Sequence, residues 1–122
     1  MKDVNENAIL QKSKFFAIRI IRLYQHLTET KNEYVMSKQL LRCGTSIGAN
    51  VKEALRGQSR ADFGAKLNIS LKEASECEYW IELLHETDYI TDQEFNSINS
   101  DCTDLLKILM SIVKTTFSST QL

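Results

Sequence analysis

The sequence predicts an all-α protein, an up-down-up-down antiparallel four-helix bundle formed by a single domain over residues 1–122. The chain contains no proline, and its four glycines fall only between positions 44 and 64. Apolar residues recur every three or four positions, the period of an α-helix, without the sustained alternation of a strand. At 122 residues, with 43% hydrophobic and 25% charged residues, the chain has the size and composition of one soluble globular domain.

Four helices are expected, at residues 7–29, 35–56, 60–87 and 92–117. The connections between them are short, which makes neighbouring helices antiparallel. Two helix starts carry a hydroxyl N-cap three residues before an acid, Ser59 with Asp62 and Thr91 with Glu94. Each helix has one apolar face, and these faces form the expected core: Ile9, Phe16, Ile20, Leu23, Leu27, Met36, Leu40, Cys43, Ile47, Val51, Ala54, Phe63, Leu67, Ser70, Ala74, Cys77, Ile81, Leu84, Phe95, Ile98, Cys102, Leu105, Leu109 and Ile112.

The sequence spells out no enzyme and no metal site. Cys43, Cys77 and Cys102 lie on predicted core faces, where cysteine commonly packs as a small hydrophobic residue. His26 and His85 belong to no metal-ligand spacing, and no nucleophile stands beside a base. We therefore expect no catalytic residue, metal, cofactor or small-molecule substrate. No segment reaches the ~18–20 apolar residues of a membrane span, and no secretory signal is present, so a cytoplasmic location is expected.

Three of the four glycines lie in the segment RCGTSIGANVKEALRG, residues 42–57. A phosphate-binding P-loop needs G-x-x-x-x-G-K-[ST] between a strand and a helix. Gly44 and Gly48 are one residue too close for it, and Ala49 follows instead of lysine. Because each glycine inside a helix costs about 1 kcal/mol relative to alanine, we expect a neighbouring helix, from the same subunit or another, to pack closely along them.

Charge is unevenly distributed along the chain. Residues 11–72 hold twelve Lys or Arg against four Asp or Glu, whereas residues 73–106 hold ten acids and no Lys or Arg. Four cations fall within an arc of about 80° on the outer face of the second helix, and Arg60 follows after the turn. These four are Lys38, Arg42, Lys52 and Arg56. This basic stripe is a solvated face, a nucleic-acid surface, or the partner of acidic residues in the same bundle, a neighbouring subunit or another protein.

The third helix carries more apolar surface than one core face requires. Its second stripe consists of Ala65, Ile69, Tyr79, Trp80 and Leu83. The first helix likewise places Phe15, Ile18 and Ile21 away from its core face. Because exposed apolar patches of this size mark association sites, we predict a homo-oligomer, with cyclic symmetry, through these stripes.

The segments GTSIGANVKEA, SRADF and LNISLKEASECEYWIELL together resemble the bacterial four-helix-bundle family encoded in intervening sequences of 23S ribosomal RNA genes. The resemblance covers about residues 36–86. The matching positions are Gly44, Ser46, Ile47, Ala49, Asn50, Val51 and Glu53, with Gly48 inside the same block, then Asp62 and Phe63, then Glu82 and Leu83.

This resemblance implies a helical bundle that assembles as a homo-oligomer, a cyclic pentamer in relatives. It also implies kinship with the accessory proteins of diversity-generating retroelements, which are thought to bring nucleic acid and a reverse transcriptase together. For Asn50 and Glu53 we expect a hydrogen-bonded network with Arg56 or Arg60 that fixes helix register or an oligomer contact.

Two hypotheses of function follow. The first is an oligomeric adaptor that contacts RNA or a ribonucleoprotein through the basic stripe. The second, favoured by the net charge of −1 and the acidic block at 73–106, is a protein-interaction scaffold that binds no nucleic acid.

Overall fold

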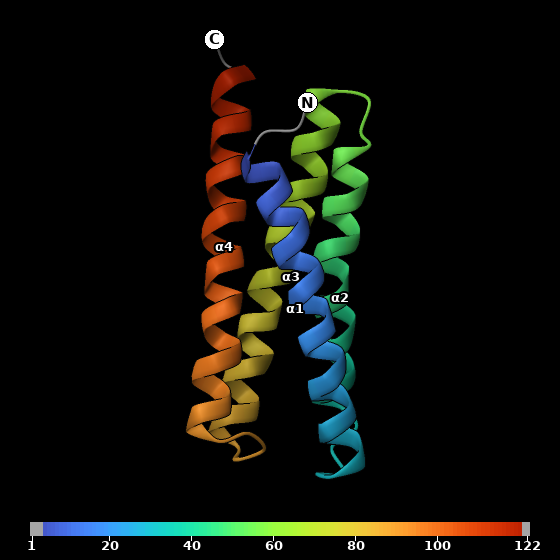
Figure 1. The fold of residues 1–122 in the computed structure, drawn as a ribbon, viewed down its shortest axis with the longest axis vertical. Coiled ribbons are helices and arrows are strands. Elements are labelled where there is room, and N and C mark those ends of the chain that lie inside the picture. Colours follow the sequence, from blue (N-terminus) through green and yellow to red (C-terminus); the bar gives the residue numbers. More distant parts are fainter. Residues whose placement is uncertain (1–3, 121–122) are drawn as a thin grey trace.

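The computed structural model describes the backbone of residues 4–120 and the side chains of residues 6–117. It consists of α1 (Val4–Glu29), α2 (Met36–Leu55), α3 (Arg60–Glu86) and α4 (Asp92–Thr120), with no strand in this described part (Figure 1). The predicted fold class is confirmed. The first helix begins three residues earlier than expected and the last ends three residues later, because no proline or glycine stands near either end to stop it.

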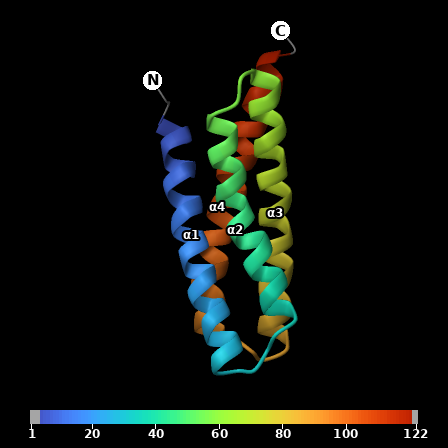
Figure 2. The same cartoon turned by 90° about the vertical axis from the view of Figure 1, so that its right-hand side faces the viewer.

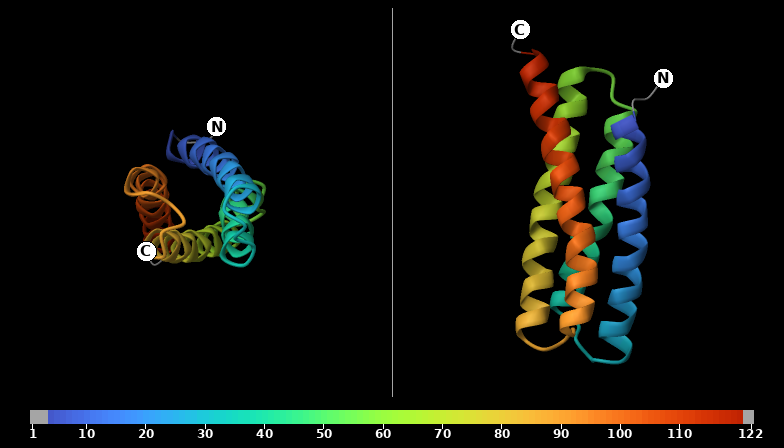
Figure 3. Two further views of the ribbon diagram at one scale, coloured as in Figure 1. Left: turned by 90° about the horizontal axis from the view of Figure 1, so that it is seen from below. Right: turned by 60° about the vertical axis from the view of Figure 1, so that its left-hand side comes forward.

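The helices run alternately up and down and follow one another around the bundle in chain order (Figures 1 and 3). Each helix packs against the next, and α4 returns to pack against α1. Within the described residues the diagonal pairs, α1 with α3 and α2 with α4, do not meet. In Figure 2, α1 and α3 stand on opposite sides of α2. The outer faces of α1 and α3 therefore point to opposite sides of the molecule.

The core runs along the bundle axis and consists of the apolar faces that the helical period predicts. Every predicted core residue is buried except Leu23, Met36, Phe63 and Phe95, which are half-buried at the edges of the core. The prediction is thus confirmed along all four helices, because in a bundle the residues that repeat at three and four positions share the inward face.

The two glycines in the middle of α2 face α1. Gly44 packs against Ile20, and Gly48 packs against the backbone and hydroxyl of Ser13. The predicted close approach is confirmed, and the approaching helix belongs to the same chain. The glycines therefore set the distance between the first two helices.

Both predicted N-caps are present. The Ser59 hydroxyl accepts a hydrogen bond of 3.0 Å from the backbone N–H of Asp62. Thr91 and Glu94 form a reciprocal capping box, in which each side chain accepts from the other residue's backbone N–H, at 3.1 and 2.8 Å. These bonds fix the starts of α3 and α4.

The start of α2 is capped by a residue that the sequence did not single out. The buried Glu33 carboxylate accepts hydrogen bonds from the backbone N–H groups of Val35, Met36 and Ser37, at 3.2, 3.1 and 2.7 Å. Burial raises the pKa of Glu33, but these hydrogen bonds outweigh it and hold the pKa below its ordinary value. One carboxylate thereby satisfies three helix-start donors that would otherwise lack partners.

Candidate nucleic-acid and assembly surfaces

The outer face of α2 carries three exposed cations of the basic stripe, Lys38, Lys52 and Arg56. Within the part of the chain that the structure describes, none of the three forms an ion pair. They stand along one helix, at intervals that keep them on one side of it. Because none of the three is held in an ion pair there, their charges are available to a polyanion.

Arg42 differs from its neighbours in the stripe. Its guanidinium forms an ion pair with Glu73 of α3 at 3.2 Å and a second, shorter one with Glu76. Hydrogen bonds from the Trp80 indole, at 2.9 Å, and from Arg42 hold the pKa of Glu76 below its ordinary value. For Arg42, therefore, the interpretation in which the stripe meets acidic residues of the same bundle is confirmed.

Lys14 of α1 joins the basic surface, although sequence reasoning did not include it. A groove of about 430 Å³ between α1 and α2 is lined by both Lys14 and Lys52, with Thr45, Gly48 and Ala49 along one wall. Small side chains leave the groove open, since Gly48 and Ala49 lie at its surface. The signal that could have found Lys14 is the glycine segment itself, because the helix that packs on it must bring its own side chains to the groove.

Arg60 lies apart from the stripe. It lines a pocket of about 190 Å³ with Glu6 of α1, Phe63 of its own helix and Thr115 and Thr116 of α4. Although Arg60 follows Arg56 closely in the chain, the turn into α3 carries it toward the α1 and α4 side of the bundle. It is therefore not part of the surface formed by Lys38, Lys52 and Arg56.

Asn50 and Glu53 have partners other than the expected ones. The Asn50 side-chain amide donates to the backbone carbonyl and the hydroxyl of Ser46, one turn earlier, at 2.9 and 3.1 Å. Glu53 pairs with Lys66 of α3 at 3.4 Å. The predicted network with Arg56 or Arg60 is wrong, because Asn50 bonds to its own helix and Glu53 pairs across to α3. They fix helix geometry and the α2–α3 contact.

Two apolar surfaces lie on the outside of the bundle. On α1, Phe15 is 59% exposed and Ile18 is 40% exposed, with Ile21 beside them. On α3, Tyr79 is 54% exposed and Ile69 is 41% exposed. We call these surfaces the α1 face and the α3 face. Since α1 and α3 are diagonal in the bundle, the two faces point in opposite directions.

Trp80 and Leu83 are half-buried at the edge of the α3 face. The Trp80 indole N–H donates to Glu76, and its ring meets the ring of Tyr79 edge-on at 5.3 Å. Because Trp80 is held by these contacts, Tyr79 and Ile69 are the residues of this face most available to a partner.

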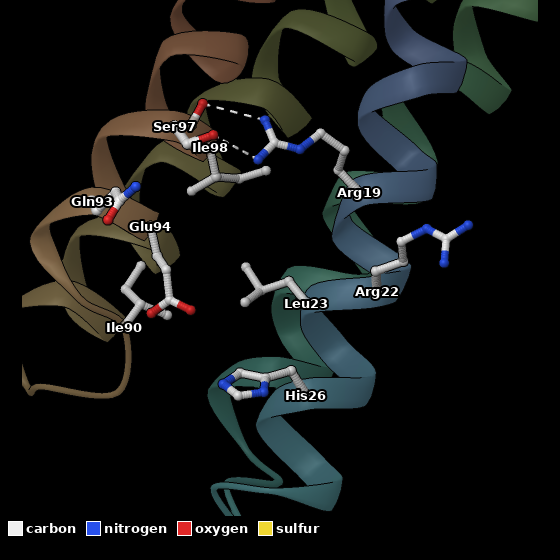
Figure 4. Close-up of a pocket in the computed structure, with 9 residues that line it drawn as sticks. All are labelled: Arg19, Arg22, Leu23, His26, Ile90, Gln93, Glu94, Ser97 and Ile98. Carbon is white, nitrogen blue, oxygen red and sulfur yellow. Dashed lines mark hydrogen bonds between the residues drawn. The ribbon is translucent and has the colours of Figure 1, made fainter.

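A second groove, of about 440 Å³, lies between α1 and α4 (Figure 4). Arg19 crosses it and binds Asp101 at 2.5 Å and the Ser97 hydroxyl at 2.8 Å. Figure 4 shows His26 and Glu94 directed into this space and Arg22 directed away from it. With Arg19 and His26 on one wall and the Glu94 carboxylate on the other, polar groups line both sides of the groove. Across this groove, Arg19 of α1 is bonded to Asp101 and Ser97 of α4 and so holds the two helices together.

The cysteines and histidines do not assemble a ligand set. In the described residues no three His, Cys, Asp or Glu side chains are grouped to hold a metal ion. His85 pairs with Asp92 at 2.6 Å and stacks on the Phe95 ring at a centroid distance of 4.2 Å, at the turn into α4. All three cysteines are buried.

No helix in the described part of the chain is long and apolar enough to cross a membrane.

Comparison with known proteins agrees with the motifs of the second and third helices. The family model described as "23S rRNA-intervening sequence protein" matches residues 5–111. A crystal structure from Bacteroides thetaiotaomicron VPI-5482, of a protein with unknown function from the S23 ribosomal protein family, is 56% identical. The match covers 91% of this chain and 99% of that one, with a TM-score of 0.89. No curated protein matches the chain. The matched range includes part or all of each of the four helices, and the chain belongs to the 23S rRNA-intervening sequence protein family.

Proposed function

We propose that this protein is a non-enzymatic, oligomeric helical adaptor that contacts RNA or a ribonucleoprotein through the outer face of α2. The observation that carries the proposal is the set of exposed cations without an ion-pair partner among the described residues, Lys38, Lys52 and Arg56, with Lys14 on the neighbouring helix. Clustered cations of this kind release counterions from a nucleic-acid backbone. The 56% identical neighbour is described as a member of the S23 ribosomal protein family, which agrees with a ribonucleoprotein partner.

In this proposal the subunits associate head to tail, with the α1 face of one copy against the α3 face of the next. Each face exposes apolar side chains, among them Ile18 on α1 and Tyr79 on α3. Two different faces that point in opposite directions favour heterologous contacts, which close into a ring when the rotation permits. Because relatives in the resembling family form cyclic pentamers, we propose a ring of five subunits. The same resemblance implies a kinship with the accessory proteins of diversity-generating retroelements.

Charge supports the same pairing of faces. Helical periodicity places Lys14 and Arg22 beside the α1 face, with Glu29 at the end of the helix. It places Glu82 and Glu86, together with Lys72, around the α3 face; Glu76 of this face is already paired with Arg42. A mainly basic rim opposite a mainly acidic rim attracts unlike faces and opposes the association of two like faces.

Assembly strengthens the proposed contact with RNA. One subunit offers only a few free cations, and each exposed charge contributes little by itself. A ring repeats the stripe in every subunit, so an RNA that spans two stripes binds the second one as an intramolecular event. This explains how a chain with a net charge of −1 can hold a polyanion.

The side chains give no support to an enzymatic function. Each histidine lies in the last turn of its helix, His26 in α1 and His85 in α3, whereas the three thiols are buried in the core. In the described residues, the α1–α2 and α1–α4 grooves contain no nucleophile paired with a base. We therefore place the function in binding and assembly.

A protein-interaction scaffold that binds no nucleic acid is the second candidate. It is favoured by one specific observation, the neutralisation of Arg42 by Glu73 and Glu76, which removes one of the four cations from the stripe. In this case the remaining cations would meet an acidic protein partner.

A binding titration distinguishes the two candidates. A fluorescent RNA is titrated with the protein at several salt concentrations, beside the charge-reversed variant Lys38→Glu/Lys52→Glu/Arg56→Glu. The adaptor predicts binding that weakens with salt, with a slope of log K against log salt between about −2 and −4 per subunit, and loss of binding in the variant. Absence of binding by the native protein at low salt would contradict the adaptor and leave the scaffold.

A further inference from the structure

Two thiols from different helices meet inside the core. Cys43 of α2 and Cys77 of α3 place their Sγ atoms 3.0 Å apart, a distance at which one thiol donates a hydrogen bond to the other. Both side chains are fully buried. The third thiol, on Cys102 of α4, is directed elsewhere and lies 3.4 Å from the backbone carbonyl of Ala74. Among the three cysteines, therefore, only Cys43 and Cys77 have their sulfur atoms in direct contact.

We propose that Cys43 and Cys77 are a dithiol that a peroxide converts into an interhelical disulfide within the native bundle, while Cys102 remains a thiol. The disulfide would be a covalent modification site inside the core, away from the surfaces described above. It is independent of the proposed function, because it concerns the α2–α3 core and neither outer surface.

The two sulfurs are separated by a short distance. A disulfide has an S–S distance of about 2.05 Å, so the two sulfurs must approach by about 1 Å. The two helices are already close along this seam, since the Ser70 hydroxyl of α3 donates to the backbone carbonyl of Ile47 on α2 at 2.9 Å. A bond across this seam joins helices that are consecutive in the chain and already packed together, so it requires no change of topology.

The chemistry balances with hydrogen peroxide as the oxidant. The sulfur of one cysteine attacks the peroxide, an S–O bond forms as the O–O bond breaks, and one water leaves, giving a sulfenic acid. The second sulfur then attacks this sulfur, the S–S bond forms as the S–O bond breaks, and a second water leaves. Two thiols lose two electrons and two protons, and one peroxide becomes two waters.

Burial controls the rate of this reaction. The hydrogen bond with Cys43 and burial both raise the pKa of Cys77, and burial raises the pKa of Cys102 to about 12. Protonated, enclosed thiols react slowly, so oxidation depends on transient local opening of the bundle. The dithiol should therefore respond to sustained peroxide and react more slowly than an exposed thiol.

Oxidation should make the fold more stable. The bond would close a loop between residues 43 and 77 and restrict the unfolded chain. We expect the melting temperature to rise by about 5–10 °C. Addition of dithiothreitol should reverse the rise.

The test treats the full-length protein with hydrogen peroxide in the presence of a peptide that carries one exposed cysteine as a reference. The sample is quenched with catalase, denatured, alkylated with iodoacetamide and weighed by mass spectrometry. The expected result is one alkylated cysteine instead of three, with the loss of two hydrogens. Digestion with trypsin and a glutamate-specific protease separates Cys77 from Cys102 and should show the peptide of Cys43 joined to that of Cys77.

Two variants complete the test. Cys102→Ala should keep the cross-link and leave no thiol to alkylate, whereas Cys77→Ala should lose it. If Cys77→Ala does not fold, the peptide map of the native protein still shows which two cysteines are joined. Three free thiols after peroxide treatment has continued for many times the oxidation time of the reference peptide, a bond to Cys102, or a bond between two chains would each overturn the proposal.

Discussion

Gly44 of α2 lies so close to Ile20 of α1 that a Cβ atom at position 44 would stand 2.7 Å from Ile20 Cγ2. Cβ atoms do not approach a neighbour this closely without displacing it. Ile20 is fully buried and β-branched, so it has little freedom to move away. The first glycine of the GTSIGAN segment is therefore a requirement of helix packing, which accounts for a residue that by itself weakens the helix.

Replacement of Gly44 by alanine should destabilise the protein. The gain in helix propensity is about 1 kcal/mol, and the clash with Ile20 should outweigh it, for a net loss of about 1–3 kcal/mol as in other overpacked cores. Urea denaturation followed by circular dichroism measures the difference.

Gly48 provides the matched control for this substitution. A Cβ at position 48 would lie 3.4 Å from the Ser13 backbone oxygen, an ordinary contact. We expect Gly48→Ala to leave stability unchanged or to raise it by up to about 1 kcal/mol. Equal effects of the two alanine variants would show that the α1–α2 approach is not what requires Gly44.

Glu33→Gln should destabilise the protein in a pH-dependent manner. The carboxylate is only 7% exposed and accepts three backbone hydrogen bonds, so its loss should cost about 1–3 kcal/mol at pH 7. Because the folded pKa is lowered, this contribution is complete above the pKa of the unfolded chain and is lost as the pH falls through the folded pKa. The difference in the free energy of unfolding between the native and variant proteins should thus decrease below about pH 4.5.

Denaturation curves at several pH values measure this gap. Glu29→Gln, at the exposed end of α1, is the control and should change stability by less than about 0.5 kcal/mol. A gap that stays constant down to pH 3 would show that the charge of Glu33 has no role in capping α2.

Arg42 and Lys52 should differ in their effect on RNA binding. Arg42→Ala removes a cation that Glu73 and Glu76 already neutralise, so we expect a small change in RNA affinity and a stability loss within about 1 kcal/mol. Lys52→Ala removes a free cation and should weaken RNA binding severalfold and reduce the salt slope by about one. A salt titration of both variants measures this. If Arg42→Ala weakened binding more than Lys52→Ala, the proposed RNA surface would be misplaced.

The sequence was sufficient to predict the helices and the core because both depend on local periodicity. Residues such as Phe16, Leu67 and Leu109 are buried because they repeat at helical spacing, and the chain has no proline to interrupt the pattern. The sequence predicts that Gly44 and Gly48 contact a neighbouring helix. It does not predict which helix, because periodicity does not identify the neighbour across a helical face.

Contacts between helices could not be predicted, because they depend on the register in which two helices pack. This is why the partners of Arg42 and Glu53 on α3, and the pairing of Cys43 with Cys77, emerge only from the structure. Glu33 was missed for a local reason. It caps α2 from a position before the N-cap residue, where sequence rules look for a serine, threonine, aspartate or asparagine at the cap itself.

The central claim, head-to-tail association of the α1 face with the α3 face, is tested by two variants and their mixture. Phe15→Glu/Ile18→Glu disables the α1 face and leaves the α3 face intact, whereas Ile69→Glu/Tyr79→Glu does the reverse. Each side chain is exposed in the subunit, so both variants should fold. Circular dichroism checks this before their masses are compared.

Light scattering coupled to size-exclusion chromatography is the decisive measurement. The account predicts that the native protein is an oligomer, that each variant alone is a monomer, and that an equimolar mixture forms a one-to-one heterodimer through the single intact pair of faces. A variant that remains oligomeric by itself, or a mixture that remains monomeric, would contradict head-to-tail association.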